Sequence, residues 1–208
     1  MSIFTTKILP VGLILAVFAS VAISLVAMTE VATHERIIEN ERQTLLAAIN
    51  ALVKPNDYDN AILMDTLTLP ATTQLATQQD TVVYRARQDD QPIAAIFTSI
   101  APNGYNGKIK LLVGVYYDGS LAGVRVISHK ETPGLGDKID VKKSDWILRF
   151  VGLSPTNPTV SKWVVKKDGG VFDQFTGATI TPRAVVSAVH NALIYFAENR
   201  DALFKESN

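Results

Sequence analysis

The stretch that decides the fold reads Asp173-Gln174-Phe175-Thr176-Gly177-Ala178-Thr179-Ile180-Thr181-Pro182. Its pattern predicts the end of a strand, a turn of small residues, and a helix that starts near Pro182 with Thr181 as its cap. Glycine and alanine in the turn leave the backbone open to close approach by a large group. Unpaired amides and the helix dipole favour a phosphate at this point. From the residues alone, an ordinary strand-to-helix turn remains the simpler interpretation.

The helix after this turn is expected to run from about Pro182 to Asn199. Its predicted apolar face, at helical spacing, consists of Val185, Val186, Val189, Leu193 and Phe196. His190 is the lone histidine of this helix, so we expect a surface or packing residue rather than a ligand.

Strands are predicted to dominate the segment before the turn. The strongest turn signal is Asp118-Gly119, which is typical of a tight hairpin. The predicted strand pairs are 81–87 with 92–99, 108–117 with 121–128, and 163–167 with 171–175. Together with the helix, they predict one α+β domain with an antiparallel sheet and flanking helices. We expect Trp146 and Trp163 to be core or interface residues.

The N-terminal part of the chain predicts a membrane span. No residue from Ile8 to Thr29 is charged, between Lys7 and Glu30, and a helix of that length crosses a hydrocarbon core of roughly 30 Å. A cleaved signal peptide usually has a shorter apolar core, and a buried soluble helix is rarely apolar on every face. Positive charges lie on both sides of the span, so they do not decide its orientation.

A polar region is expected to link the span to the domain. The seven-residue spacing of Val31, Ile38, Leu45 and Leu52, with Ile49 on the same face, predicts an amphipathic stalk helix. It is expected to end at Lys54-Pro55 and to pack on its own domain or on a partner. Residues 55–80 are interpreted as an irregular wrap with a short helix at 61–66. The predicted organisation is an anchor at 1–29, stalk and wrap at 30–80, and a domain at 81–208.

Composition excludes several functions. Lys plus Arg total 20 and Asp plus Glu total 20, so there is no basic surface for nucleic acid. The absence of cysteine excludes disulfides, thiolate metal sites and Cys-ligated clusters. Any redox chemistry must therefore reside in a cofactor. His129 and Glu131 lack further ligands nearby in the sequence and do not indicate a metal site.

The run Asp-x-x-Thr-Gly-Ala-Thr that ends at Thr179 resembles the flavinylation motif of the FMN-binding domain family. That family includes the G subunit of Rnf-type complexes and the C subunit of sodium-pumping NADH:quinone oxidoreductases. The resemblance implies FMN esterified through its phosphate to Thr179 by a separate flavin transferase that consumes FAD. The neighbouring residues implied to contact FMN are Thr176, Gly177 and Ala178.

Two further segments resemble the same family. The Glu-Thr-Pro-Gly-Leu-Gly run is a family hallmark around the flavin ring, and it implies that the pocket contains Glu131, Thr132, Leu135, Gly136 and Lys138. The stretch Gly104-Tyr105-Asn106-Gly107 resembles the segment that opens the domain, with Tyr105 mostly structural. All three motifs follow the family's order along the chain.

The resemblance favours the G subunit of an Rnf-type complex over the C subunit of the sodium pump. It implies an electron relay among membrane and peripheral subunits, with a single-pass anchor in the bacterial inner membrane and the domain facing the periplasm. No Gly-x-Gly-x-x-Gly turn indicates an NADH site. Two alternatives are a membrane-tethered flavin reductase that acts alone and an assembly subunit without a redox role.

Overall fold

The computed structural model describes residues 9–205, which divide into two compact units between Leu46 and Ala47. The first unit consists of most of the long helix α1 (Leu9–Asn50), and the last turn of α1 belongs to the second unit. Lys7 and Ile8, where the span was predicted to begin, lie outside the described residues.

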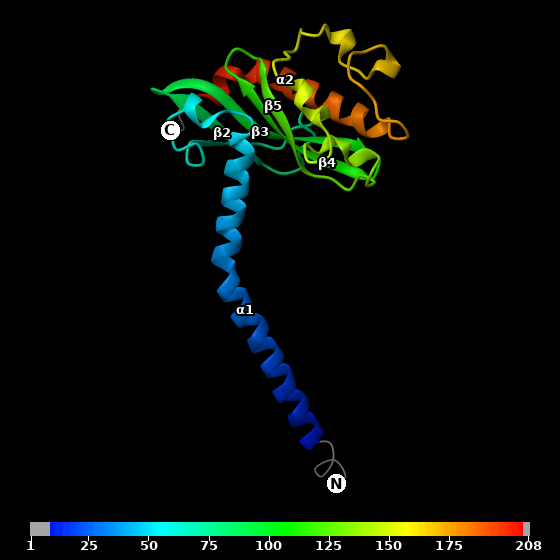
Figure 1. Ribbon diagram of the computed structural model, residues 1–208. Helices are drawn as coiled ribbons and strands as arrows, with labels where there is room; N and C mark the ends of the chain where they lie inside the picture. Colours follow the sequence, from blue (N-terminus) through cyan, green and yellow to red (C-terminus); the bar gives the residue numbers. More distant parts are fainter. Residues whose placement is uncertain (1–8, 206–208) are drawn as a thin grey trace. The chain divides into compact units, whose positions relative to one another are not determined.

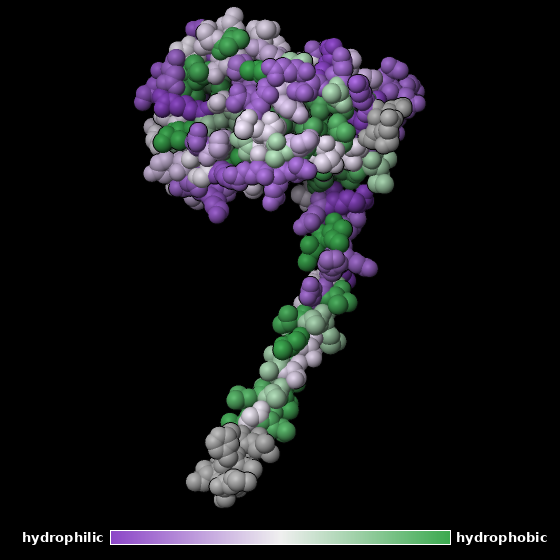
Figure 2. All heavy atoms as spheres, turned by 180° about the vertical axis from the view of Figure 1, so that it is seen from behind, coloured by the Kyte–Doolittle hydropathy of each residue, from purple (hydrophilic) through white to green (hydrophobic). Residues whose placement is uncertain are grey.

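The helix α1 runs without a break from an apolar segment into a polar one. Among the described residues, one helix is long and apolar enough to cross a membrane, and its most apolar window is not buried. Figure 2 shows apolar side chains, in green, along the N-terminal part of this helix and hydrophilic ones, in purple, farther along. The helix ends at Asn50, slightly before the predicted end at Lys54, and the guanidinium of Arg125 donates to the carbonyl oxygen of Ala51 at 2.7 Å.

The second unit contains a five-stranded antiparallel sheet in which neighbours in sequence are neighbours in space (Figure 1). Its strands are β1 (Thr66–Leu69), β2 (Thr81–Gln88), β3 (Gln91–Gly104), β4 (Gly107–Tyr116) and β5 (Leu121–Ser128). The first two predicted hairpins are therefore confirmed. Asp89 and Asp90 form the β2–β3 turn with φ of 48° and 62°, the left-handed conformation that tight hairpins need.

The helix α2 (Ile180–Leu203) packs against β3 and covers one face of the sheet (Figure 1). Every member of its predicted apolar face is buried. The helix is longer than predicted at both ends. Pro182 is tolerated because it lies in the first turn, where an N–H has no partner within the helix.

Leu52, which follows α1, packs on the opposite face of the sheet. Gly114 and Gly123 are paired across β4 and β5, and a Cβ on either would lie 3.2 or 3.0 Å from atoms of Leu52. Leu111 and Val113 alternate with Gly114 along β4 and join the core on the α2 side. The paired glycines thus make room for a leucine that covers the second face.

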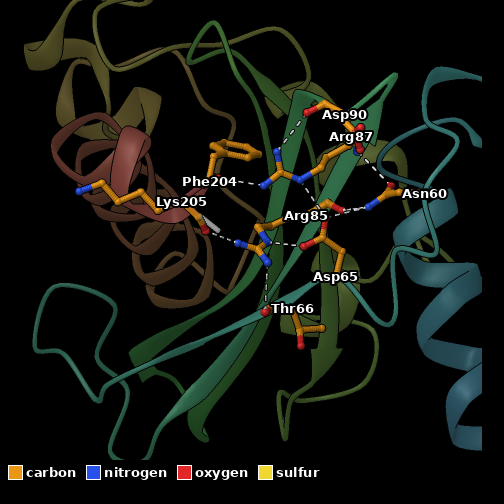
Figure 3. A network of polar contacts seen from close by, with 8 residues as sticks. All are labelled: Asn60, Asp65, Thr66, Arg85, Arg87, Asp90, Phe204 and Lys205. Carbon is orange, nitrogen blue, oxygen red and sulfur yellow. Dashed lines mark hydrogen bonds and ion pairs between the residues drawn. The ribbon is translucent and has the colours of Figure 1, made fainter. Parts of the chain in front are cut away.

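The predicted short helix at 61–66 is wrong. Residues 61–65 form a turn, and strand β1 begins at Thr66, where its backbone pairs with β2. Asp65 accepts hydrogen bonds from Arg85 at 2.5 Å and from Arg87 at 2.9 Å. The same guanidinium groups donate to the carbonyl oxygens of Lys205 and Phe204 after α2 (Figure 3). This network fixes the C-terminal end of α2 to the sheet.

The third predicted hairpin, 163–167 with 171–175, is also wrong. The segment follows the short 3-10 helix η5 (Val160–Lys162) and contains another, η6 (Lys166–Asp168). One bridge, between Val165 and Phe172, joins the two predicted strands, and it is parallel. A Cβ on Gly170 would lie 1.8 Å from the carbonyl oxygen of Val164. Asp168-Gly169-Gly170 therefore allows two backbone segments to approach closely instead of turning a strand.

The aromatic side chains of this region form one end of the core. Trp146, in η4 (Asp145–Phe150), and Trp163 are both buried, which confirms them as core residues. His190 stacks on Trp163 with ring centroids 4.9 Å apart, so it is a packing residue as predicted. The cluster is completed by Phe150, Phe172 and Phe175.

Candidate functional site

A cavity of about 240 Å³ lies where three distant segments of the second unit meet. The segments are the β3–β4 turn, the loop that runs from Glu131 to Gly136, and the turn before α2. The residues that line the cavity are Tyr105, Glu131, Thr132, Leu135, Gly136, Gly177, Ala178 and Thr181. The fold thus brings the glycine-containing loop and the Thr-Gly-Ala-Thr turn to one pocket.

Glu131 joins all three segments. Its carboxylate is buried and accepts hydrogen bonds from the backbone N–H groups of Tyr105, at 3.3 Å, and Asn106, at 3.0 Å. It also accepts a short hydrogen bond from the hydroxyl of Thr181. A buried carboxylate is costly unless donors surround it, and here three donors come from two other segments.

Two glycines make room for this carboxylate. A Cβ on Gly136 would lie 2.8 Å from Oε2 of Glu131 and 2.9 Å from Oγ1 of Thr181. A Cβ on Gly104 would lie 2.9 Å from Oε1 of Glu131 and 2.3 Å from the carbonyl oxygen of Gly107. Any side chain at either position would displace Glu131 or the hairpin.

The turn before α2 has a defined conformation. Gly177 has φ of 78°, and the N–H of Ala178 donates to the carbonyl oxygen of Phe175 at 3.1 Å. Thr179 occupies the cap position, and its side chain makes no capping hydrogen bond in the described part of the chain. The prediction that Thr181 caps the helix is wrong, because Thr181 lies within α2 and its buried hydroxyl donates to Glu131.

Asp173, which precedes this turn, anchors the backbone that leads into it. Its carboxylate pairs with Lys166 at 2.5 Å and with Arg149, and its carbonyl oxygen accepts from the indole N–H of Trp146 at 2.7 Å. The hydrogen bond from Lys166 and the nearby guanidinium of Arg149 lower the pKa of Asp173. The carboxylate therefore stays ionised and fixes the start of the turn.

Six of the nine predicted site residues line the pocket, namely Glu131, Thr132, Leu135, Gly136, Gly177 and Ala178. The remaining three, Thr176, Thr179 and Lys138, do not line it. Thr176 is exposed on the turn and Thr179 is half-buried beside it. Lys138 is half-buried in η3 (Gly136–Ile139), and its carbonyl oxygen accepts from Ser144.

Sequence reasoning missed two residues of the pocket. Tyr105 was expected to be mostly structural, but its side chain is 65% exposed and lines the cavity. Its place at the tip of the Gly104–Gly107 turn is the signal that could have indicated this exposure. Thr181 was assigned to the cap, and only the fold reveals its contact with Glu131. Within residues 9–205, no group of three or more His, Asp or Glu side chains could hold a metal ion.

Comparisons with known proteins match both parts of the chain. Residues 104–194 match the family described as FMN-binding domain, and residues 1–52 match the family described as RnfG N-terminal region. The first match includes every residue that lines the pocket.

Several curated relatives cover almost the whole chain. The G subunit of the ion-translocating oxidoreductase complex of Pseudoalteromonas atlantica is 49% identical over 197 residues, which cover 95% of this chain and 92% of the relative. The same subunit of Vibrio cholerae is 48% identical over 95% and 94%, and that of Pseudomonas aeruginosa is 48% identical over 92% and 90%. The chain therefore belongs to the family of G subunits of ion-translocating oxidoreductase complexes, and it contains an FMN-binding domain.

Proposed function

We propose that this protein carries FMN as a covalent phosphoester on Thr179 and relays electrons through it within an Rnf-type complex. One observation carries the proposal: the Thr-Gly-Ala-Thr turn and the loop from Glu131 to Gly136 share a single pocket. Thr179 follows Ala178, which lines that pocket, and its hydroxyl is not used to cap α2.

The residues present fit a flavin. At Gly136 and Gly177 the backbone itself lines the pocket, with no side chain above it. A Cβ on Gly136 would collide with Glu131, and a Cβ on Gly177 would contact Leu135 at 3.5 Å. Leu135 and Tyr105 are exposed at the rim and offer apolar contact to a ring. The cavity is smaller than a typical pocket of about 300–1,000 Å³, so it fits part of the cofactor and leaves the rest accessible to a partner.

The covalent step balances with FAD as the donor. The hydroxyl oxygen of Thr179 attacks the phosphorus on the flavin side of the FAD pyrophosphate, AMP leaves, and the hydroxyl proton passes to solvent or to the transferase. The chain then carries FMN less one water. Bound FMN supplies electron-transfer chemistry, while the protein holds and orients it.

The proposed setting is the bacterial inner membrane. The apolar part of α1 has the length and composition of a membrane anchor, and the curated relatives are named as parts of an ion-translocating oxidoreductase complex. We infer that the domain faces the periplasm and exchanges electrons with other membrane and peripheral subunits. A flavin transferase is the partner required for maturation.

The proposal is tested by intact mass of the full-length chain in detergent, produced with and without a flavin transferase. The expected result is an increase by the mass of FMN less water that depends on the transferase and disappears in Thr179→Ala. No increase with a demonstrably active transferase would refute the relay and favour an assembly subunit without a redox role.

A further inference from the structure

Arg183 and Asp168 form an ion pair beside the turn that carries Thr179. Two guanidinium nitrogens of Arg183 donate to the two carboxylate oxygens of Asp168, both at 2.6 Å. The side chains are 44% and 34% exposed, so the pair contributes little to stability. Its effect is to hold a guanidinium in a fixed orientation at the start of α2.

Helical geometry places Arg183 on the same face as Thr179. Thr179 has helical dihedral angles, φ −77° and ψ −29°, and its carbonyl oxygen accepts from the N–H of Arg183 at 3.3 Å. Side chains four residues apart on a helix have Cβ atoms about 5–6 Å apart. Because helical side chains lean toward the N-terminus, the side chain of Arg183 leans toward Thr179.

Two other cations near this turn have a different partner. Arg149 and Lys166 both pair with Asp173, which stands at the entrance to the turn. Those two side chains therefore fix the incoming backbone, whereas Arg183 stands one helical turn beyond Thr179.

We propose that Arg183 binds the phosphate of the flavin ester on Thr179, and that it exchanges Asp168 for this phosphate when the ester forms. A phosphodiester keeps one negative charge and two free oxygens, which match the pair of N–H donors that Arg183 directs at Asp168. The distance is one helical turn, so a rotation of the long side chain is sufficient. Arg183 is thus a phosphate-binding residue, and Asp168 holds it in place before the ester forms.

This inference rests on the proposed function, and phosphorus NMR of the loaded, full-length chain in a phosphorus-free detergent tests it. The variants are Arg183→Gln, Arg183→Lys and Asp168→Asn. Arg200→Gln, at the other end of α2, is the matched control. Tryptophan fluorescence verifies that each variant is folded, and the loaded wild type unfolded in urea gives the reference position of a free ester.

Arg183→Gln is expected to move the phosphorus resonance from its native position toward the urea-unfolded position. Arg183→Lys is expected to move it partly, because lysine keeps the charge but not the fork. Asp168→Asn and Arg200→Gln are expected to leave it at the native position. An unchanged resonance in Arg183→Gln, or an equal displacement in Asp168→Asn, would overturn the exchange. Failure of the wild type to load any flavin would instead refute the ester itself.

Discussion

The hydroxyl of Thr181 donates a hydrogen bond to the carboxylate of Glu131, 50 residues earlier in the chain. The same carboxylate accepts from the backbone of the β3–β4 turn. One buried side chain therefore holds together the three segments that line the pocket.

Glu131→Gln is expected to destabilise the domain by about 1–3 kcal/mol, because an amide nitrogen replaces one accepting oxygen and a buried donor is left without a partner. Urea unfolding followed by tryptophan fluorescence measures this change, since both tryptophans lie in the second unit. The matched control is Glu198→Gln, on the exposed part of α2, with an expected effect of less than about 0.5 kcal/mol. Equal effects in the two variants would show that Glu131 does not hold the segments together.

Gly136→Ala is expected to abolish flavin loading, because its Cβ would lie 2.8 Å from Glu131 and 2.9 Å from Thr181. Gly134→Ala provides the comparison, since Gly134 has φ of 77° but no atom within 4 Å of an added Cβ. Gly134→Ala should cost about 1 kcal/mol in backbone strain and keep its flavin. The ratio of flavin absorbance to protein mass distinguishes the two, and normal loading of Gly136→Ala would contradict the pocket described here.

Asp65→Ala is expected to destabilise the domain by about 3 kcal/mol, because Arg85 has a side chain only 7% exposed and would lose its counter-charge. Asp201→Ala, whose carboxylate is 76% exposed, is the control and should change little. Urea unfolding measures both variants. Flavin loading should survive in folded Asp65→Ala, since the network in Figure 3 does not include the pocket.

His190 is expected to make stability depend on pH. Burial lowers the pKa of His190 below its ordinary 6.5, against a weaker opposing effect of a hydrogen bond to the carbonyl of Pro155. The unfolded chain therefore binds a proton at a higher pH than the folded domain does. The contribution of His190 to the free energy of unfolding is therefore fully present above pH 6.5. It is lost as the pH falls from 6.5 through the pKa of the folded state.

The control for this effect is His190→Phe, which keeps a ring beside Trp163 and cannot titrate. The difference in unfolding free energy between wild type and His190→Phe, followed from neutral to mildly acidic pH, isolates the residue. A difference that does not change with pH would contradict the assignment.

The sequence was sufficient for the elements that local patterns specify. Asp118-Gly119 located one hairpin, and the spacing from Val185 to Phe196 identified the buried face of α2. The Thr-Gly-Ala-Thr turn and the loop at Glu131 were likewise identified by motif. In each case, the information lies within one short segment.

The errors arose where long-range contacts decide the structure. Asp168-Gly169-Gly170 resembles a hairpin turn, but residue 170 is glycine because a side chain there would collide with the backbone of Val164. Thr181 suits a helix cap locally, yet its partner is a distant carboxylate. Strand β1 is only four residues long and depends on pairing with β2 and on the ion pairs of Asp65.

The most direct test of the central claim is to map the flavin by fragmenting the tryptic peptide that spans Asp168 to Arg183, from full-length protein matured by a flavin transferase. This peptide contains Thr176, Thr179 and Thr181, so its fragment ions distinguish the three possible acceptors. The expected result is the whole increment, FMN less water, on Thr179. An increment on Thr176 or Thr181, or an unmodified peptide despite an active transferase, would contradict the claim.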